Sequence, residues 1–199
     1  EHMGDPNAMK TISFHELYTL DFELSDLFGQ KQKWIKGVLF RMDHPRHSSA
    51  VIYLNGCHGK YTNKRGELID APCKSLVYLP YGSEYTVLNF DCGSQQPDAY
   101  LVEFNVICGG EKAAFSDSPF VIENVNSYLA AEMLREAVEA YEASVQSPAA
   151  VKAAVYKVLA FLGKEGSFGF RFSLPARNGP LFSFSISLKL GLISFQFSP

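Results

Sequence analysis

The spacing of apolar residues changes once along this chain, and the change divides it into a strand-rich part and a helical part. Between residues 10 and 110, short runs rich in Val, Ile, Tyr and Phe alternate with clusters of Gly, Pro and Asn. Several short strands at this spacing favour an antiparallel barrel or sandwich over β-α-β units. We therefore predict a small all-β barrel. The runs expected to form strands are 34–42, 49–54, 59–62, 75–79, 85–90 and 100–107.

The helical part begins near Asn124. From there to Val145, apolar residues recur at steps of three and four while Glu and Arg occupy the other faces, which is the pattern of an amphipathic helix. Ser147 and Pro148 then offer an N-cap followed by proline at the first helical position, and a second helix is expected to end at Gly163. Because the connection is short, the two helices are predicted to form an antiparallel hairpin.

The apolar stripe of the first helix has two interpretations. It could cover one face of the barrel, or it could be the contact of a homodimer, because three-four spacing is also typical of a coiled-coil seam. We state the homodimer as the prediction to be tested and keep the covering role as the alternative. The stripe consists of Ala131, Leu134, Val138, Tyr141 and Val145.

Composition excludes several classes of protein. A net charge of -3 gives no basic footprint for DNA or RNA. No apolar run is long enough to cross a bilayer, and no signal-peptide pattern precedes the strands. The four cysteines form no CxxC pair, so we expect them to be reduced, in a cytoplasmic protein. They are Cys57, Cys73, Cys92 and Cys108.

These observations divide the chain into four segments. Residues 1–8 are expected to be a cloning scar, 9–110 the barrel, 111–163 the helical hairpin, and 164–199 an atypical tail of unknown role. From residue 166 onwards the tail has no acidic residue and holds seven of the sixteen phenylalanines. A truncated or out-of-frame end to a longer gene is one hypothesis for it.

Catalytic signatures are weak. A metal site on early strands would need two histidines and a carboxylate, whereas His44 and His47 flank a proline with no Glu shortly after them. His58 lies at an expected hairpin. Neither a Gly-x-Ser-x-Gly elbow nor a Gly-x-Gly-x-x-Gly phosphate loop occurs. We therefore expect no catalytic residue, metal or cofactor.

Binding of a small molecule is the favoured interpretation. Aromatic and polar side chains on the expected strands could line a pocket inside the barrel, although neighbouring strand residues alternate faces and cannot all point inward. Glu103 stands out because Val102 and Phe104 flank it. The candidates are Trp34, Arg41, Tyr53, Tyr78, Tyr85 and Glu103.

The segment 75–89 carries the most specific pattern. The apolar run 75–79 leads into Pro80, and Gly82 supplies the backbone freedom of a turn before the next strand. The spacing resembles the second cupin motif, Pro-x-Gly-x2-His-x3-Asn, with Tyr85 in place of the metal-binding His. A phenol is a poor ligand for a divalent metal at neutral pH but can stack on or hydrogen-bond an organic ligand.

Together with the helix pair, this segment resembles the N-terminal sensor domain of AraC-type transcriptional regulators over roughly residues 10–163. The resemblance also rests on residues 52–56 and Lys60-Tyr61. It implies a cupin-like double-stranded β-helix that binds a small effector, often a sugar or related metabolite, and helices that dimerise. The family's DNA-binding module has no counterpart here, so DNA binding would need a module outside this chain. The alternatives are a cupin-type isomerase or dioxygenase with a degenerate site, and a stand-alone ligand-binding cupin.

Overall fold

A computed structural model gives the fold of most of the chain. It is mainly β, with 41% strand and 24% helix, as the sequence predicted. The expected scar at 1–8 lies outside the described residues. In the tail, only the backbone of short strands is described, including β13 (Phe170–Phe172), β14 (Phe184–Lys189) and β15 (Leu192–Phe197). The described residues are 10–93, 95–165, 167–168, 170–172, 184–189 and 192–197.

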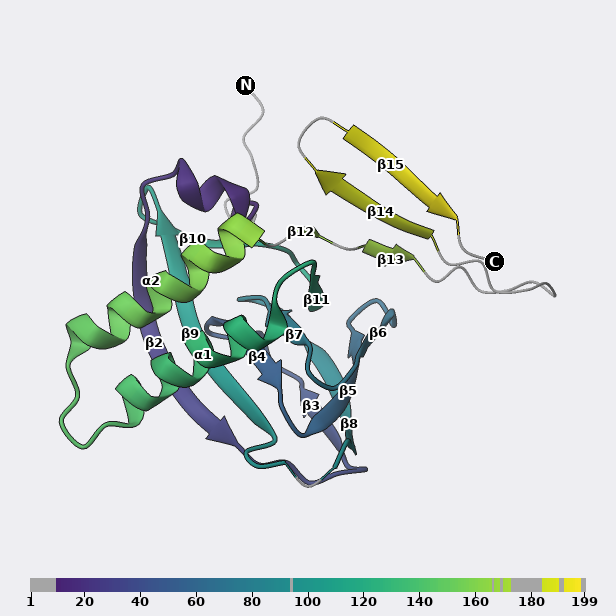
Figure 1. Ribbon diagram of the computed structural model, residues 1–199, viewed down its shortest axis with the longest axis horizontal. Coiled ribbons are helices and arrows are strands. Elements are labelled where there is room, and N and C mark those ends of the chain that lie inside the picture. The colour runs from purple at the N-terminus through teal and green to yellow at the C-terminus, as the bar shows by residue number, and fades with distance from the viewer. Residues whose placement is uncertain are drawn as a thin grey trace.

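The larger sheet curls into a half barrel (Figure 1). Its strands are β1 (Lys10–Thr11), β2 (Glu23–Gln32), β4 (Ser49–Leu54), β7 (Leu76–Leu79), β9 (Ala99–Cys108), β10 (Glu111–Ala114), β11 (Phe120–Glu123) and β12 (Ser167–Phe168). Their order is β1-β10-β9-β4-β7-β11-β12, and β2 also pairs with β9. The sheet therefore continues past residue 110, where we expected the barrel to end.

The smaller sheet has the order β3-β8-β5-β6 and is antiparallel throughout. The turn before β8 contains Gly82 with φ 75°, the left-handed conformation for which glycine was expected there. The run predicted at 34–42 forms a strand only over its last four residues. The strands are β3 (Leu39–Met42), β5 (Cys57–Asn63), β6 (Leu68–Ala71) and β8 (Tyr85–Asp91).

Two helices lie side by side across one face of the larger sheet (Figure 1). Helix α1 (Ser127–Glu142) begins where the side chain of Asn126 accepts a hydrogen bond from Leu129 N. Helix α2 (Pro148–Glu165) begins after Ser147, whose Oγ accepts from Ala150 N at 3.3 Å. The predicted hairpin is confirmed. A short 3-10 helix, η1 (His15–Tyr18), packs near α2. No helix of the described chain is long and apolar enough to cross a membrane.

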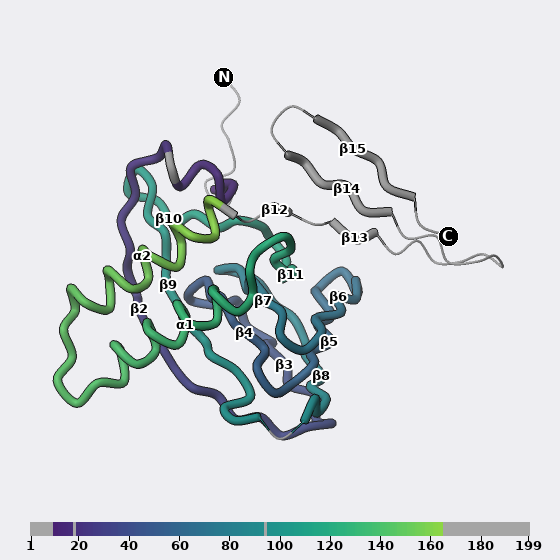
Figure 2. Tube along the Cα trace, viewed as in Figure 1, coloured from purple at the N-terminus to yellow at the C-terminus, as the bar shows by residue number. Residues whose placement is uncertain are grey.

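The larger sheet separates two hydrophobic clusters because adjacent strand residues point to opposite faces. On β4, Val51 and Tyr53 face the helices, whereas Ile52 and Leu54 face the smaller sheet. The space between the sheets is thus a packed core in its own right. Figure 2 shows the same arrangement as a Cα trace, with the helices on one side of the larger sheet and the smaller sheet on the other.

The apolar stripe of α1 packs on the protein's own sheet, which corrects the expected dimer seam. Leu134 and Val138 are 0% exposed and belong to the cluster between helix and sheet, and Ala131 packs against its edge. The ring of Tyr141 contacts that of Phe28 at a centroid distance of 5.1 Å. Leu134 and Val138 are therefore already covered within one chain and are not available to a partner.

Two further details complete this correction. Val145 lies beyond the end of α1 and is 86% exposed, so it is not part of the stripe. Helix α1 also approaches β2 unusually closely at Gly29, where an added Cβ would lie 3.1 Å from the Cα of Val138. Helix α1 therefore packs directly against the backbone of β2.

Candidate functional site

The six predicted ligand residues are divided between different surfaces. Tyr85 packs in the cluster between the two sheets, with Trp34 at its margin. Glu103 lies on β9, one position away from Val102 and Phe104, which face the helices. These three are the candidates that lie toward the barrel interior.

The other three do not line that interior. Tyr53 and Tyr78 face the helices. The Tyr78 hydroxyl shares a hydrogen bond with Ser49 Oγ at 2.8 Å and accepts one from Phe115 N at 3.1 Å. Burial raises the pKa of Tyr78 to about 12. Arg41 is exposed on the edge strand β3. Tyr78 is thus a structural core residue and Arg41 a surface residue.

A different arginine occupies the barrel interior. The backbone of Arg46 is held by the turn before β8, since its N donates to Ser83 O at 3.1 Å and its O accepts from Gly82 N at 2.9 Å. The turn that contains the cupin-like motif therefore positions Arg46. Because Arg46 lies in a loop between expected strands, no sequence pattern pointed to it.

The side chain of Arg46 joins the two best interior candidates. Nη1 donates to the Tyr85 hydroxyl at 3.0 Å, Nη2 donates to Glu103 Oε1, and Ser48 Oγ donates to Glu103 Oε2 at 3.1 Å. Burial raises the pKa of Tyr85, and the nearby Arg46 only partly offsets this. The phenol therefore stays neutral. In this buried cluster the charges of Arg46 and Glu103 are paired with each other. The cluster is therefore part of the wall of the barrel.

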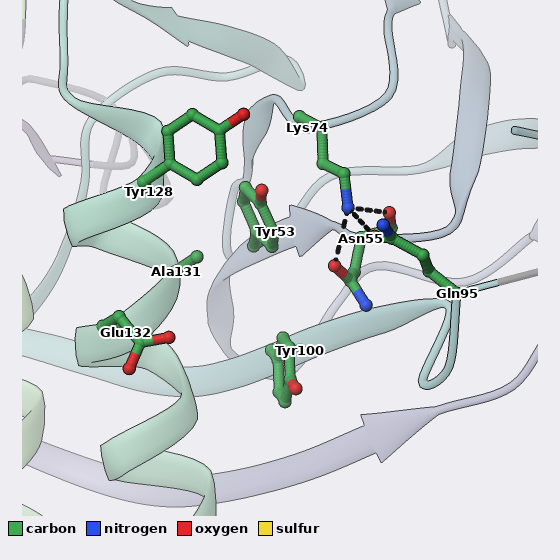
Figure 3. A pocket seen from close by; sticks show the side chains of 8 residues that line it. All are labelled: Tyr53, Asn55, Lys74, Gln95, Tyr100, Tyr128, Ala131 and Glu132. Carbon is green, nitrogen blue, oxygen red and sulfur yellow. Dashed lines mark hydrogen bonds between the residues drawn. The ribbon is translucent and has the colours of Figure 1, made fainter. Parts of the chain in front are cut away.

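A hollow outside the barrel interior lies between β4, β9, the start of α1 and three loops (Figure 3). Its volume is about 430 Å³, within the range of roughly 300–1,000 Å³ that is typical of small-molecule sites. We call it the tyrosine pocket. Its lining residues are Tyr53, Asn55, Lys74, Gln95, Tyr100, Tyr128, Ala131 and Glu132.

Three phenols define this pocket. Tyr53 and Tyr100 are direct cross-strand partners on β4 and β9, and such partners present neighbouring side chains on one face. Tyr128 lies in the first turn of α1 and is 73% exposed. None of the three hydroxyls has a hydrogen-bond partner among the residues that the structure describes. Burial, followed by the neighbouring Tyr128, raises the pKa of Tyr53, so its phenol is neutral at physiological pH.

A polar wall faces the phenols. Lys74 Nζ donates to the backbone O of Asn55 at 2.7 Å, to its Oδ1 at 2.9 Å, and to Gln95 Oε1 (Figure 3). On the opposite side, Glu132 is paired with Arg135 at 2.6 Å. Both charged groups therefore already have partners, and the pocket as a whole is polar without a strong net charge.

The loop that carries Gln95 packs against the turn between β4 and β5. Asn55 N and Gly56 N both donate to Asp98 O at 2.8 Å, and a Cβ on Gly56 would lie 2.3 Å from Gln95 O. Burial alone would raise the pKa of Asp98, but the Lys36 ammonium, 2.7 Å from Asp98 Oδ1, and the hydrogen bond from Trp34 N leave this pKa below its usual value. Asp98 therefore remains a carboxylate that binds Lys36 and Trp34 N, while its backbone O holds the turn at Asn55 and Gly56.

A second, smaller hollow contains two of the predicted residues. It measures about 210 Å³ and includes Arg41 and Tyr85. This volume is below the usual range for ligand sites.

His44 and His47, which the sequence did not favour as metal ligands, line neither hollow, and their rings lie 6.1 Å apart. Across the described ranges, no three His, Cys, Asp or Glu side chains form a group that could hold a metal.

Sequence reasoning missed most of the tyrosine pocket. Of the six candidates only Tyr53 lines it. Tyr100, an aromatic residue on an expected strand, and Tyr128 were not selected, because only the cross-strand register and the position of α1 bring them together with Tyr53. Lys74 and Gln95 lie in turns between strands, and the sequence of these turns carries no recognisable motif.

No protein-family model matches the sequence, and no curated protein matches it either. The resemblance to AraC-type sensor domains therefore rests on the residues described above alone.

Proposed function

We propose that this chain binds a small, polar, uncharged metabolite in the tyrosine pocket. The observation that supports this proposal is the set of three phenol hydroxyls without partners around a hollow of suitable volume. A sugar fits this chemistry, because its hydroxyls can bond phenols while its C–H faces pack on aromatic rings.

The wider role that we propose is that of the effector-binding and dimerisation part of a cytoplasmic transcription regulator. The supporting observations are the hairpin with Tyr85 in place of a metal-binding His, a half barrel, and the helix pair that follows it. In this proposal the two sheets are a divergent cupin-like double-stranded β-helix. DNA is contacted only through a module outside this sequence.

The binding proposal is tested by thermal denaturation of the full chain with neutral monosaccharides, sugar acids and hydroxylated aromatic acids. One class should raise the Tm, since a ligand at a hundred times its Kd stabilises by about 2.7 kcal/mol. Tyr100→Phe should weaken that ligand by roughly fivefold to tenfold, the worth of about one lost hydrogen bond.

The matched control is Tyr81→Phe. Tyr81 lies in the turn between β7 and β8, next to the start of β4, where its N donates to Ser49 Oγ at 3.0 Å. It does not line the tyrosine pocket. This variant should bind as the wild type does. If no compound class shifts the Tm, or if Tyr100→Phe binds unchanged, the tyrosine pocket is not the site.

The proposed homodimer must use a surface other than the stripe of α1. The exposed apolar side chains of this region are Tyr128, Leu129 and Val145, on the first turn of α1 and in the loop before α2. We expect sedimentation velocity at micromolar concentration to show a dimer that Leu129→Asp weakens. A wild-type monomer under these conditions refutes the dimer.

A further inference from the structure

A row of polar side chains crosses three strands of the smaller sheet and lines the smaller hollow. Arg41 on β3 lies directly opposite Thr86 on β8, and Thr86 lies directly opposite Thr62 on β5. Such partners present their side chains on the same face, with Cβ atoms roughly 5 Å apart. Tyr85 and Val87, on either side of Thr86, pack in the cluster between the sheets. The row therefore lies on the outer face of the sheet, and all three of its residues line the hollow.

The polar groups of this row are free to bind a ligand. Among the residues that the structure describes, the guanidinium of Arg41 and the hydroxyls of Thr62 and Thr86 have no hydrogen-bond or ion-pair partner. Lys64 also lines the hollow, but its ammonium already lies 2.9 Å from Glu84 Oε1. The unused groups are thus one fork of N–H donors and two hydroxyls, which is a set that suits an oxyanion.

The charges around the hollow select the kind of oxyanion. An arginine fork matches both carboxylate and phosphate. Two carboxylates, of Asp43 and Glu84, also line the hollow. Each has a partner, since Glu84 is paired with Lys64 and Asp43 Oδ1 lies 3.3 Å from His44 Nδ1, but their negative charges still repel an anion nearby. A ligand with one negative charge is repelled less than a phosphate dianion, so the site favours a carboxylate.

The size and the remaining wall of the hollow limit the rest of the ligand. A volume of about 210 Å³ holds roughly seven water molecules at about 30 Å³ each. It is therefore too small for a sugar acid with its hydration shell, but it accommodates a carboxylate with a short tail. Met42 and Tyr85 complete the wall and offer apolar surface to such a tail.

We propose that this hollow is a second ligand site, which binds a short-chain monocarboxylate. The carboxylate accepts hydrogen bonds from the guanidinium of Arg41 and from the hydroxyls of Thr62 and Thr86, and the aliphatic tail packs on Met42 and Tyr85. The two hollows share no lining residue. The proposal therefore does not rest on the proposed function of the tyrosine pocket.

The test is a titration of the full chain with sodium propionate at constant ionic strength, followed by amide chemical shifts. We expect saturable changes at Arg41, Thr62 and Thr86, with a Kd on the order of a millimolar because so small a ligand makes few contacts. Propionamide, which has the same shape without the charge, should give no saturable change. Inorganic phosphate should bind at least threefold more weakly than propionate. No saturable change with propionate, an equal response to propionamide, or tighter binding of phosphate overturns the proposal.

Two variants and a control assign the binding to these residues. Arg41→Gln should weaken propionate at least tenfold, because it removes the charge-assisted fork, and Thr86→Val should weaken it roughly threefold to tenfold. Arg41 is exposed, so its replacement should leave the Tm within about 2 °C of the wild type. Arg65→Gln is the matched control, since Arg65 is an exposed arginine that is paired with Asp117 and does not line the hollow. Unchanged binding by Arg41→Gln, or equal weakening by Arg65→Gln, contradicts the site.

Discussion

Replacing Glu103 with leucine is expected to lower the free energy of unfolding by about 3 kcal/mol. The change leaves the guanidinium of Arg46, whose side chain is only 7% exposed, without its carboxylate. Breaking a buried ion pair typically costs roughly 3–5 kcal/mol. We take the low end because the side chain of Glu103 is 25% exposed, so water reaches the cluster. Urea denaturation of the two proteins measures the difference.

The double variant Arg46→Met with Glu103→Leu is the control for this effect. Since no unpaired charge remains in it, we expect it to be more stable than Glu103→Leu alone, although it still loses the hydrogen bond to Tyr85. If Glu103→Leu costs less than about 1 kcal/mol, Arg46 finds another partner or water, and the cluster is more open than its contacts indicate.

Leu134→Ala is expected to destabilise the protein by about 2–5 kcal/mol. Leu134 is 0% exposed in the cluster between α1 and the larger sheet, and truncation of such a side chain leaves a cavity in addition to the lost burial. Leu68→Ala is the matched control, because Leu68 lies on β6, away from the helices, and is 64% exposed. The control should change the free energy of unfolding by no more than about 0.5 kcal/mol.

This pair of variants separates the two interpretations of the helix stripe. If the stripe met a second copy and not its own sheet, Leu134→Ala would dissociate a dimer with little loss of monomer stability. Denaturation of wild type and Leu134→Ala at two protein concentrations makes the distinction. If the stripe were the dimer contact, the substitution would abolish the concentration dependence of the midpoint, whereas a stripe that packs on the sheet predicts a lower midpoint at both concentrations.

The sequence predicted the parts of the fold whose signal is local. Strand β4 has the predicted bounds, and Asn126 and Ser147 cap helices near the expected positions. Strand β2 was missed because ELSDLFGQKQ has no simple apolar alternation. It is a strand because it pairs with β9, with a register shift between Ser25 and Phe28, and that pairing is a tertiary contact.

The candidate site depends on such tertiary contacts to a greater extent. Three-four spacing cannot distinguish a helix that covers a sheet from one that meets a second helix, so the stripe containing Leu134 was open to both interpretations. Arg41 was preferred to Arg46 because it lies on a strand, but β3 is an edge strand and Arg41 is exposed. The tyrosine pocket forms only when register and helix placement bring Tyr53, Tyr100 and Tyr128 together.

The most direct test of ligand binding is a map of amide chemical shifts by NMR during titration of the full chain with its best-stabilising compound. We expect the largest changes at Asn55, Gln95, Tyr100 and Tyr128, around the tyrosine pocket. Changes concentrated at Arg46, Tyr85 and Glu103 would place the ligand inside the barrel and contradict this account.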